Sequence, residues 1–207
     1  MFDFSLMSLV AGLPGLLIAL VLHEYAHARV ADAMGDFTPR MQGRLTLNPK
    51  AHIDPIGLVM LLIAHFGWAK PVMINPRNFK NWRKGELFVA LAGPGANLAI
   101  AFVTMICMAV LFKMGIYSEG VRLVLSMIVL YNINFAIFNM IPVPPLDGSK
   151  VLLMFLPGKY VYKMASLERY SFIILIVMMM TPVLSLILIP LNHLVLGLFN
   201  GIIGVFL

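Results

Sequence analysis

Residues 16–34 read LLIALVLHEYAHARVADAM, and within this largely apolar stretch His23, Glu24 and His27 form the pattern H-E-x-x-H. Residues four apart lie on one face of an α-helix, so both imidazoles can bind one Zn²⁺ while Glu24 reaches a water on the metal. Ionisable side chains in a membrane helix are costly and functional by default. The alternative is that they pair with neighbouring helices or lie at the membrane interface.

Composition places that stretch in a membrane protein. The chain has 207 residues, of which 61% are apolar and 12% charged, whereas soluble proteins have about 25% charged residues. An ordinary soluble protein and a disordered chain are therefore excluded. We expect an all-α polytopic membrane protein in which residues 1–207 form one domain. The lone Cys107 excludes an intramolecular disulfide and a cysteine-based metal site.

Runs without charged residues give the expected crossings. Three such runs can each span a bilayer once: residues 4–22, which continue as a helical pattern to about residue 34, residues 87–112 and residues 123–146. Residues 170–207 can form two short passes with a break near Pro182 or Pro190. A further apolar run, at residues 56–69, is short. Together these runs predict five or six membrane segments. That short run is too brief for a crossing, so we expect a re-entrant or interfacial helix there.

The net charge of +6 is first a topology signal. Basic residues flank the short run on both sides, which places residues 36–85 together on the cytoplasmic side. The lipid bilayer is the expected partner. Nucleic acid is not, because no basic stretch is interleaved with aromatic side chains.

Two pieces of the cytoplasmic segment have the pattern of short β-strands. Residues 44–47 alternate polar with apolar side chains, residues 71–74 are rich in apolar ones, and both end at an Asn-Pro dipeptide. They predict a small β-sheet at the cytoplasmic surface, with two loop segments as the alternative.

A catalytic zinc usually has three protein ligands and one open position, so the two histidines need a third ligand. The candidates in or beside apolar segments are Asp54, Asp147, His52, His65 and His193. Asp147 follows a proline-rich break, and irregular backbone at membrane depth must be buried or line a wet cavity. Its alternative is an Asp-Gly turn at the interface. His52 and Asp54 either support the metal ligands or cap the short helix.

These motifs resemble the site-2 protease family of intramembrane zinc metalloproteases. The resemblance rests on H-E-x-x-H at 23–27, A-G-P-G-A-N at 92–97 and N-M-I-P-V-P-P-L-D-G at 139–148. Residues 43–49 and 52–57 resemble the compact bacterial and archaeal branch.

The resembling part, the catalytic core, covers roughly residues 8–160, and the hydrophobic segments at 170–207 show no family feature. No PDZ or CBS domain is expected.

The resemblance implies cleavage of peptide bonds in or near transmembrane segments of membrane-protein substrates. It implies one Zn²⁺ per chain, in the cytoplasmic membrane of a bacterium or archaeon, with the active site nearer the cytoplasmic face. The residues that match the family's functional positions are His23, His27 and Asp147 as metal ligands, Glu24 as general base, and Asn97 and Asn139 near the substrate or oxyanion.

Other classes of protein could use the same residues. A divalent-metal transporter predicts further His and Asp sites across the bilayer, whereas the sequence has one cluster. A catalytically inactive membrane scaffold has no need of Glu24. An aspartyl protease needs two apposed carboxylates, for which only Asp54 and Asp147 are available, and it leaves H-E-x-x-H unexplained.

Overall fold

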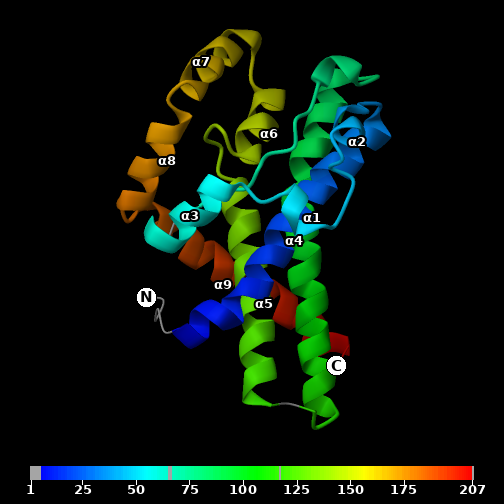
Figure 1. The fold of residues 1–207 in the computed structure, drawn as a ribbon, viewed down its shortest axis with the longest axis vertical. Helices are drawn as coiled ribbons and strands as arrows, with labels where there is room; N and C mark the ends of the chain where they lie inside the picture. The colour runs from blue at the N-terminus through cyan, green and yellow to red at the C-terminus, as the bar shows by residue number, and fades with distance from the viewer. Residues whose placement is uncertain (1–5, 65–66, 117, 207) are drawn as a thin grey trace.

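The computed structural model describes residues 6–64, 67–116 and 118–206, which are predominantly helical (Figure 1). In chain order the helices are α1 (Leu6–Met34), α2 (Thr38–Met41), η1 (Pro49–Ala51), α3 (Pro55–Ala64), η2 (Pro76–Asn78), α4 (Trp82–Lys113), α5 (Glu119–Asn139), α6 (Asp147–Phe155), α7 (Gly158–Glu168), α8 (Ser171–Met180) and α9 (Val183–Phe206). The three long helices expected from the first three charge-free runs are α1, α4 and α5.

Helices α1, α4 and α5 pack against one another pairwise at the centre of the molecule. Small residues form their contacts: Ala19, Ala90 and Ala101 are fully buried. Between α1 and α5, a Cβ on Gly15 would lie 2.9 Å from the carbonyl oxygen of Met127, so this close approach of two backbones requires glycine. Such contacts are typical of helix packing in membranes.

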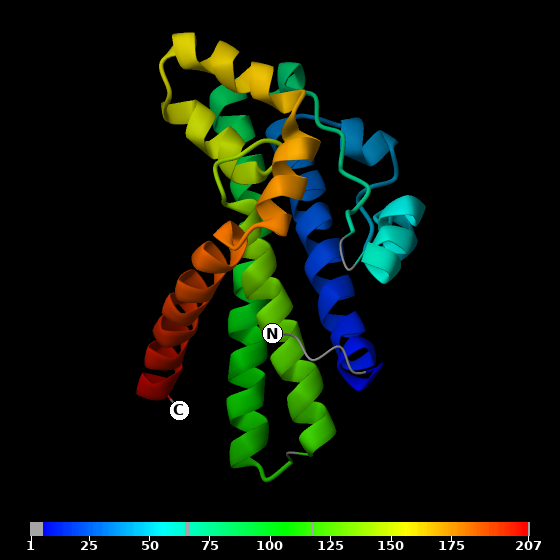
Figure 2. The ribbon, with the colours of Figure 1, turned by 90° about the vertical axis from the view of Figure 1, so that its left-hand side faces the viewer.

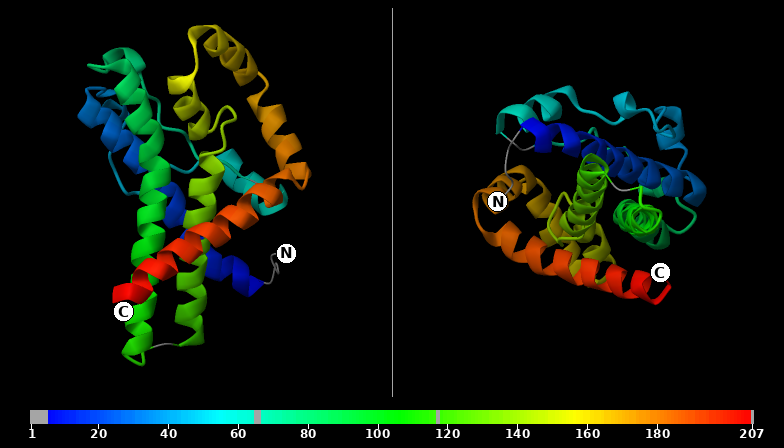
Figure 3. Two further views of the ribbon diagram at one scale, coloured as in Figure 1. Left: turned by 180° about the vertical axis from the view of Figure 1, so that it is seen from behind. Right: turned by 90° about the horizontal axis from the view of Figure 1, so that it is seen from below.

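Helix α9 covers the side of this core that faces away from α1. Figure 3 shows α4 and α5 end-on from below, between α1 and α9. Apolar side chains of α9 pack on Val129, Ile133 and Ile137 of α5. The Asn192 side chain also donates a hydrogen bond of 2.8 Å to Asn134 Oδ1, which joins the two helices by a polar contact within the apolar layer.

Four described helices are long and apolar enough to cross a membrane: Val10–Met34, Trp82–Lys113, Glu119–Asn139 and Val183–Val205. The last charge-free run does break at Thr181–Pro182, but α8 has only 10 residues. Figure 2 shows α9 leading on from α8 at an angle instead of turning back. A 10-residue helix covers about 15 Å of a hydrocarbon core about 30 Å thick. The described residues therefore give four candidate crossings, and the total of five or six membrane segments stays a prediction.

The outer surfaces of these helices support a lipid environment. Large apolar side chains are exposed on α4, α8 and α9, among them Val103, Ile173, Met180, Leu186 and Val205. Apolar surface on this scale is unusual in a soluble monomer and indicates contact with a membrane or a partner. Together with the four long apolar helices, it supports an integral membrane protein.

The predicted small β-sheet is wrong for the described residues. Residues 44–47 contain a bend and follow the turn at Gly43, whose φ of 68° is left-handed. Residues 71–75 are extended, but two of their amides bond side chains and not a neighbouring strand: Val72 N–H donates to Glu24, and Asn75 N–H to Asp36. A single antiparallel bridge between Ile53 and Ala69 replaces the sheet.

That bridge shows how the chain enters and leaves α3. Ile53 precedes the helix and Ala69 follows it, and the Lys70 N–H donates a hydrogen bond of 2.9 Å to the His52 carbonyl. The two flanks of α3 therefore lie side by side. The re-entrant or interfacial position of this helix stays a prediction.

The connections of the bundle divide unequally between its two ends. Residues 36–64 and 67–81 and the α6–α7 segment lie toward one end, and the α4–α5 connection lies at the other (Figure 2). Of the 15 lysines and arginines, only Lys113 and Arg122 belong to the α4–α5 end. The basic residues before and after α3 thus share one side of the molecule with those of α6 and α7.

Candidate metal centre

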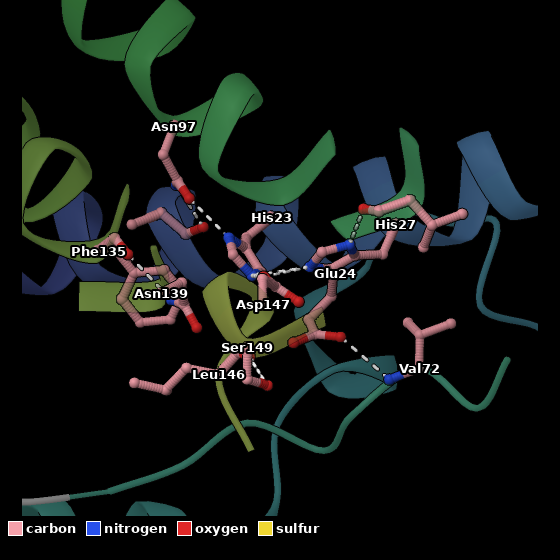
Figure 4. Close-up of polar contacts among 12 residues, drawn as sticks. His23, Glu24, His27, Val72, Asn97, Phe135, Asn139, Leu146, Asp147 and Ser149 are labelled. Atoms are coloured by element: carbon pink, nitrogen blue, oxygen red, sulfur yellow. Dashed lines mark hydrogen bonds and ion pairs between the residues drawn. The ribbon is translucent and has the colours of Figure 1, made fainter. Parts of the chain in front are cut away.

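Three buried side chains from two distant parts of the sequence converge beside α4. His23 and His27 lie one turn apart on α1, and Asp147 begins α6. Their ligand atoms form a triangle: His23 Nε2 to His27 Nε2 is 2.9 Å, and Asp147 Oδ2 lies 3.2 Å and 3.1 Å from these nitrogens (Figure 4). It is the one group of three or more His, Cys, Asp or Glu side chains in the described ranges with the geometry of a metal site.

The donor set fits a zinc ion. A tetrahedral site with bonds of about 2.0 Å places its ligand atoms about 3.3 Å apart, close to the three distances in this triangle. Asp147 Oδ2 is buried and accepts no hydrogen bond from the described residues. An orphaned anionic oxygen beside two imidazole nitrogens is the arrangement that a divalent cation satisfies.

Partners from α4 fix the orientation of both imidazole rings. His23 Nδ1 lies 2.7 Å from Asn97 Oδ1, and His27 Nδ1 lies 2.7 Å from the carbonyl oxygen of Val89. An N–H on each Nδ1 satisfies these acceptors and leaves both Nε2 lone pairs directed at Asp147. A histidine that binds a metal usually donates its other N–H in this way.

Three positions on one face of α4 serve the two histidines. Val89, Gly93 and Asn97 are four residues apart and therefore share a helix face. A Cβ on Gly93 would lie 2.5 Å from both His23 Cε1 and His27 Nε2. Gly93 therefore leaves the space that the imidazole rings occupy.

Asp147 reaches the histidines because the chain between α5 and α6 is not a regular helix. Residues 140–146 form bends and turns, as the three prolines in this stretch predict. Burial raises the pKa of the Asp147 carboxyl, but the two adjoining imidazoles, when protonated on Nε2, outweigh burial and hold the pKa well below its usual range. The group is then a carboxylate, and a metal ion bound at the triangle would take the place of the Nε2 protons.

Glu24 lies beside this triangle and is half-buried. Its Oε2 accepts a hydrogen bond of 3.0 Å from the Val72 amide, and no hydrogen bond from the described residues reaches Oε1 (Figure 4). One carboxylate oxygen is thus fixed by the extended segment at residues 71–75, and the other is available to a bound molecule.

The two asparagines expected near the substrate have different surroundings. Asn97 is fully buried, and its amide group donates to the Ala19 carbonyl and to Asn132 Oδ1, besides accepting from His23. Its polar atoms are therefore engaged within the helix bundle. Asn139 is half-buried and donates only to the Phe135 carbonyl of its own helix, at 2.9 Å.

The other candidates for the third ligand lie elsewhere. Asp54 Oδ1 accepts the amides of Ile56 and Gly57 and so caps the start of α3. His52 is fully buried against the Thr46 carbonyl. His193 is on the exposed side of α9, and His65 is outside the described residues.

Sequence reasoning did not identify Val72 or Val89 as parts of this site. Both act through backbone groups, which leave no side-chain pattern to recognise. The role of Gly93 could have been predicted from the sequence, because Gly93 lies four residues before Asn97 and therefore on the same face of α4, which meets α1.

Comparisons with known proteins identify the family of this chain. A model of "Peptidase family M50" matches residues 115–184, a stretch that contains Asn139 and Asp147. The chain is 38% identical over 180 residues to a Bacillus subtilis protein named "Putative zinc metalloprotease YwhC", covering 84% of this chain and 82% of that protein. The chain belongs to peptidase family M50. This confirms the site-2 protease family resemblance seen in the sequence.

More distant members of family M50 match as well. A Mycobacterium tuberculosis protein named "Putative zinc metalloprotease Rip2" is 29% identical over 177 residues, 83% of this chain and 67% of that protein. A Methanocaldococcus jannaschii protein named "Putative zinc metalloprotease MJ0611" is 29% identical over 161 residues, 72% of this chain and 73% of that protein. No solved structure gives a significant match.

Proposed function

We propose that this chain is an intramembrane zinc metalloprotease, which cleaves peptide bonds in or near transmembrane segments of membrane proteins. The observation that carries the proposal is the triangle of His23 Nε2, His27 Nε2 and Asp147 Oδ2, with the free oxygen of Glu24 beside it. The names of the family M50 relatives support zinc as the metal. The four long apolar helices support a membrane substrate.

His23, His27 and Asp147 would hold the ion, and Asn97 and the Val89 carbonyl keep the two imidazoles in the tautomer that would face it. Zinc in such a site supplies Lewis acidity, which makes water nucleophilic near neutral pH and polarises a carbonyl group. Glu24 Oε1 takes a proton from the attacking water and later passes it to the leaving amine. Asn139 is better placed than Asn97 to donate to the developing oxyanion, because only Asn97 has all its polar groups engaged.

We place the protein in the cytoplasmic membrane of a bacterium or archaeon because its relatives include bacterial and archaeal proteins, and the charge distribution supports its orientation there. The metal-binding triangle is on the half of α1 nearer the end of the bundle that holds residues 36–64, residues 67–81 and most of the basic side chains. The excess of Lys and Arg in short loops marks the cytoplasmic side. The site is therefore nearer the cytoplasmic face, and water reaches it by a short path.

The test combines metal analysis with cleavage. Purified wild type is expected to contain about one zinc per chain, with the content reduced in His23→Ala and Asp147→Ala and retained in Glu24→Gln. The probe for cleavage is a single-pass test substrate whose transmembrane helix contains a central Gly-Pro pair. Glu24→Gln should abolish its cleavage, since the variant keeps the size and hydrogen-bonding shape of the side chain but cannot accept the proton.

Other results would contradict the proposal. Well-folded wild type without stoichiometric metal would favour an inactive scaffold. Zinc transport into vesicles that survives Glu24→Gln would favour a divalent-metal transporter. Cleavage that persists in Glu24→Gln would remove Glu24 from the role of general base.

A further inference from the structure

Arg44 is buried without an acidic partner among the described residues. Its exposed fraction is 4%, and each ion pair of the described arginines involves Arg29 or Arg40 instead. Buried charged groups normally have a counter-charge because desolvation is costly. An arginine that is buried against neutral groups alone is unusual and calls for a specific reason.

Backbone carbonyls take the place of that counter-charge. Arg44 Nη1 donates to the carbonyls of Ala51 and, at 3.3 Å, Lys70, and Nη2 donates to that of Pro71 at 3.2 Å. Ala51 precedes α3, whereas Lys70 and Pro71 follow it. One planar guanidinium thus joins the chain before α3 to the chain after it. A lysine ammonium has no such planar array of donors and cannot reach all three carbonyls in this way.

The residue after Pro71 is the one that contacts the proposed base. Val72 N–H donates to Glu24 Oε2, so the sequence of contacts runs from Arg44 through the carbonyls of Lys70 and Pro71 to Glu24. Residues 70–72 are exposed or half-buried, and besides these contacts the Lys70 amide donates to the His52 carbonyl. Loss of the Arg44 bonds therefore frees the position of the Val72 amide.

We propose that Arg44 is a positioning residue for Glu24: it fixes the backbone of residues 70–72 so that the Val72 amide holds one carboxylate oxygen and leaves the other for water. This inference rests on the proposed protease function and adds a residue that touches neither metal nor Glu24 itself. It also explains why Arg44, in the turn after Gly43, has its guanidinium inside the protein and not in solvent.

The first experiment measures order in the segment without using activity. Spin labels at Met73 and Val103, both exposed positions, report the distance between the segment and α4 in a Cys107→Ala background. We expect one narrow distance distribution in the labelled protein that keeps Arg44. The control variant Arg40→Ala should give the same distribution, since the Arg40 side chain pairs with Asp32. Arg44→Ala should broaden it. A narrow distribution in Arg44→Ala would overturn the proposal whether or not the chain is a protease.

The second experiment measures cleavage of the Gly-Pro test substrate. Misplacement of a catalytic group by 1 Å can lower the rate about a hundredfold, so Arg44→Ala should lower kcat between about ten- and a hundredfold with KM and zinc content little changed. Arg44→Lys should recover part of the loss, because it restores charge and some hydrogen bonds. Unchanged kcat, or a loss that only follows lost zinc, would contradict the proposal.

A double-variant comparison tests the route through Val72. Val72→Pro removes the N–H that holds Glu24, whereas Val72→Ala keeps it and serves as the control. If Arg44 acts through this amide, Arg44→Ala should slow Val72→Pro little further. If the loss of cleavage rate in the double variant equals the product of the losses in the two single variants, Arg44 affects cleavage by another route. If Val72→Pro does not fold, the spin-label result still decides whether Arg44 orders the segment.

Discussion

At Gly93, helix α4 approaches α1 so closely that a side chain would enter the space of the two imidazoles. The atoms nearest to a Cβ at this position would belong to His23 and His27, at 2.5 Å. Two residues further along the same helix, a Cβ on Gly95 would meet nothing within 4 Å. Alanine substitutions at these two glycines therefore distinguish two effects. Both change the helix in the same way, but only the substitution at Gly93 enters the metal centre.

Gly93→Ala should therefore impair zinc binding, because one or both imidazoles must move. Disturbing the groups that orient metal ligands typically lowers affinity about 10- to 100-fold. Gly95→Ala should bind zinc as wild type does. Competition with a chelator on the purified proteins measures both affinities, and equal affinities in the two variants would contradict the assigned close approach.

At the scale of elements, a single carboxylate holds the end of α1 to the segment before α4. Asp36 is fully buried and accepts hydrogen bonds from the backbone amides of Thr38 and Asn75 and from the Asn78 side chain. Burial raises the pKa of this carboxyl, but the hydrogen bonds from Thr38, Asn75 and Asn78 outweigh it, and the net pKa lies below the usual value.

The lowered pKa gives the sign of a pH effect. Asp36 contributes stability that is fully present above the unfolded-state pKa, near 4, and that is lost as the pH falls through the lower folded-state pKa. Asp36→Asn should destabilise the protein by about 1–3 kcal/mol at pH 7, because buried donors lose their charged acceptor. The difference from wild type should shrink as the pH falls below about 4.

Thermal unfolding in detergent between pH 7 and pH 3 measures this difference. Glu119→Gln is the matched control, since Glu119 is exposed in the first turn of α5. Its stability should follow wild type at every pH. A constant gap between wild type and Asp36→Asn down to pH 3 would show that the ionised carboxylate is not what stabilises this junction.

For the whole molecule, the separation of charge between the two ends predicts orientation. Met41 in α2 belongs to the basic end, and Met114 follows α4 at the other; both are exposed, by 79% and 63%. With Cys107 replaced by Ala, a membrane-impermeant maleimide on intact cells should label Met114→Cys. It should label Met41→Cys only after permeabilisation. The reverse pattern would place the metal centre nearer the outer face.

Much of this architecture follows from the sequence because apolar length and charge act locally. Charge-free runs give α1, α4 and α5, since a bilayer core demands about 20 apolar residues in a helix. The H-E-x-x-H spacing places His23 and His27 on one face without reference to any partner. The proline-rich stretch before Asp147 likewise predicts an irregular chain on its own.

Tertiary structure alone decided the remainder, because it depends on which groups meet across helices. The sequence favoured Asp147 over Asp54 as third ligand through the proline-rich break and the family resemblance, but only the fold makes Asp54 the cap of α3 and Asp147 the neighbour of both histidines. The expected strand at 71–74 is extended, yet its amides bond the side chains of Glu24 and Asp36 in place of a second strand. Backbone groups such as the Val72 amide and the Val89 carbonyl are the same at every position in a sequence, and only their place in space gives them a role.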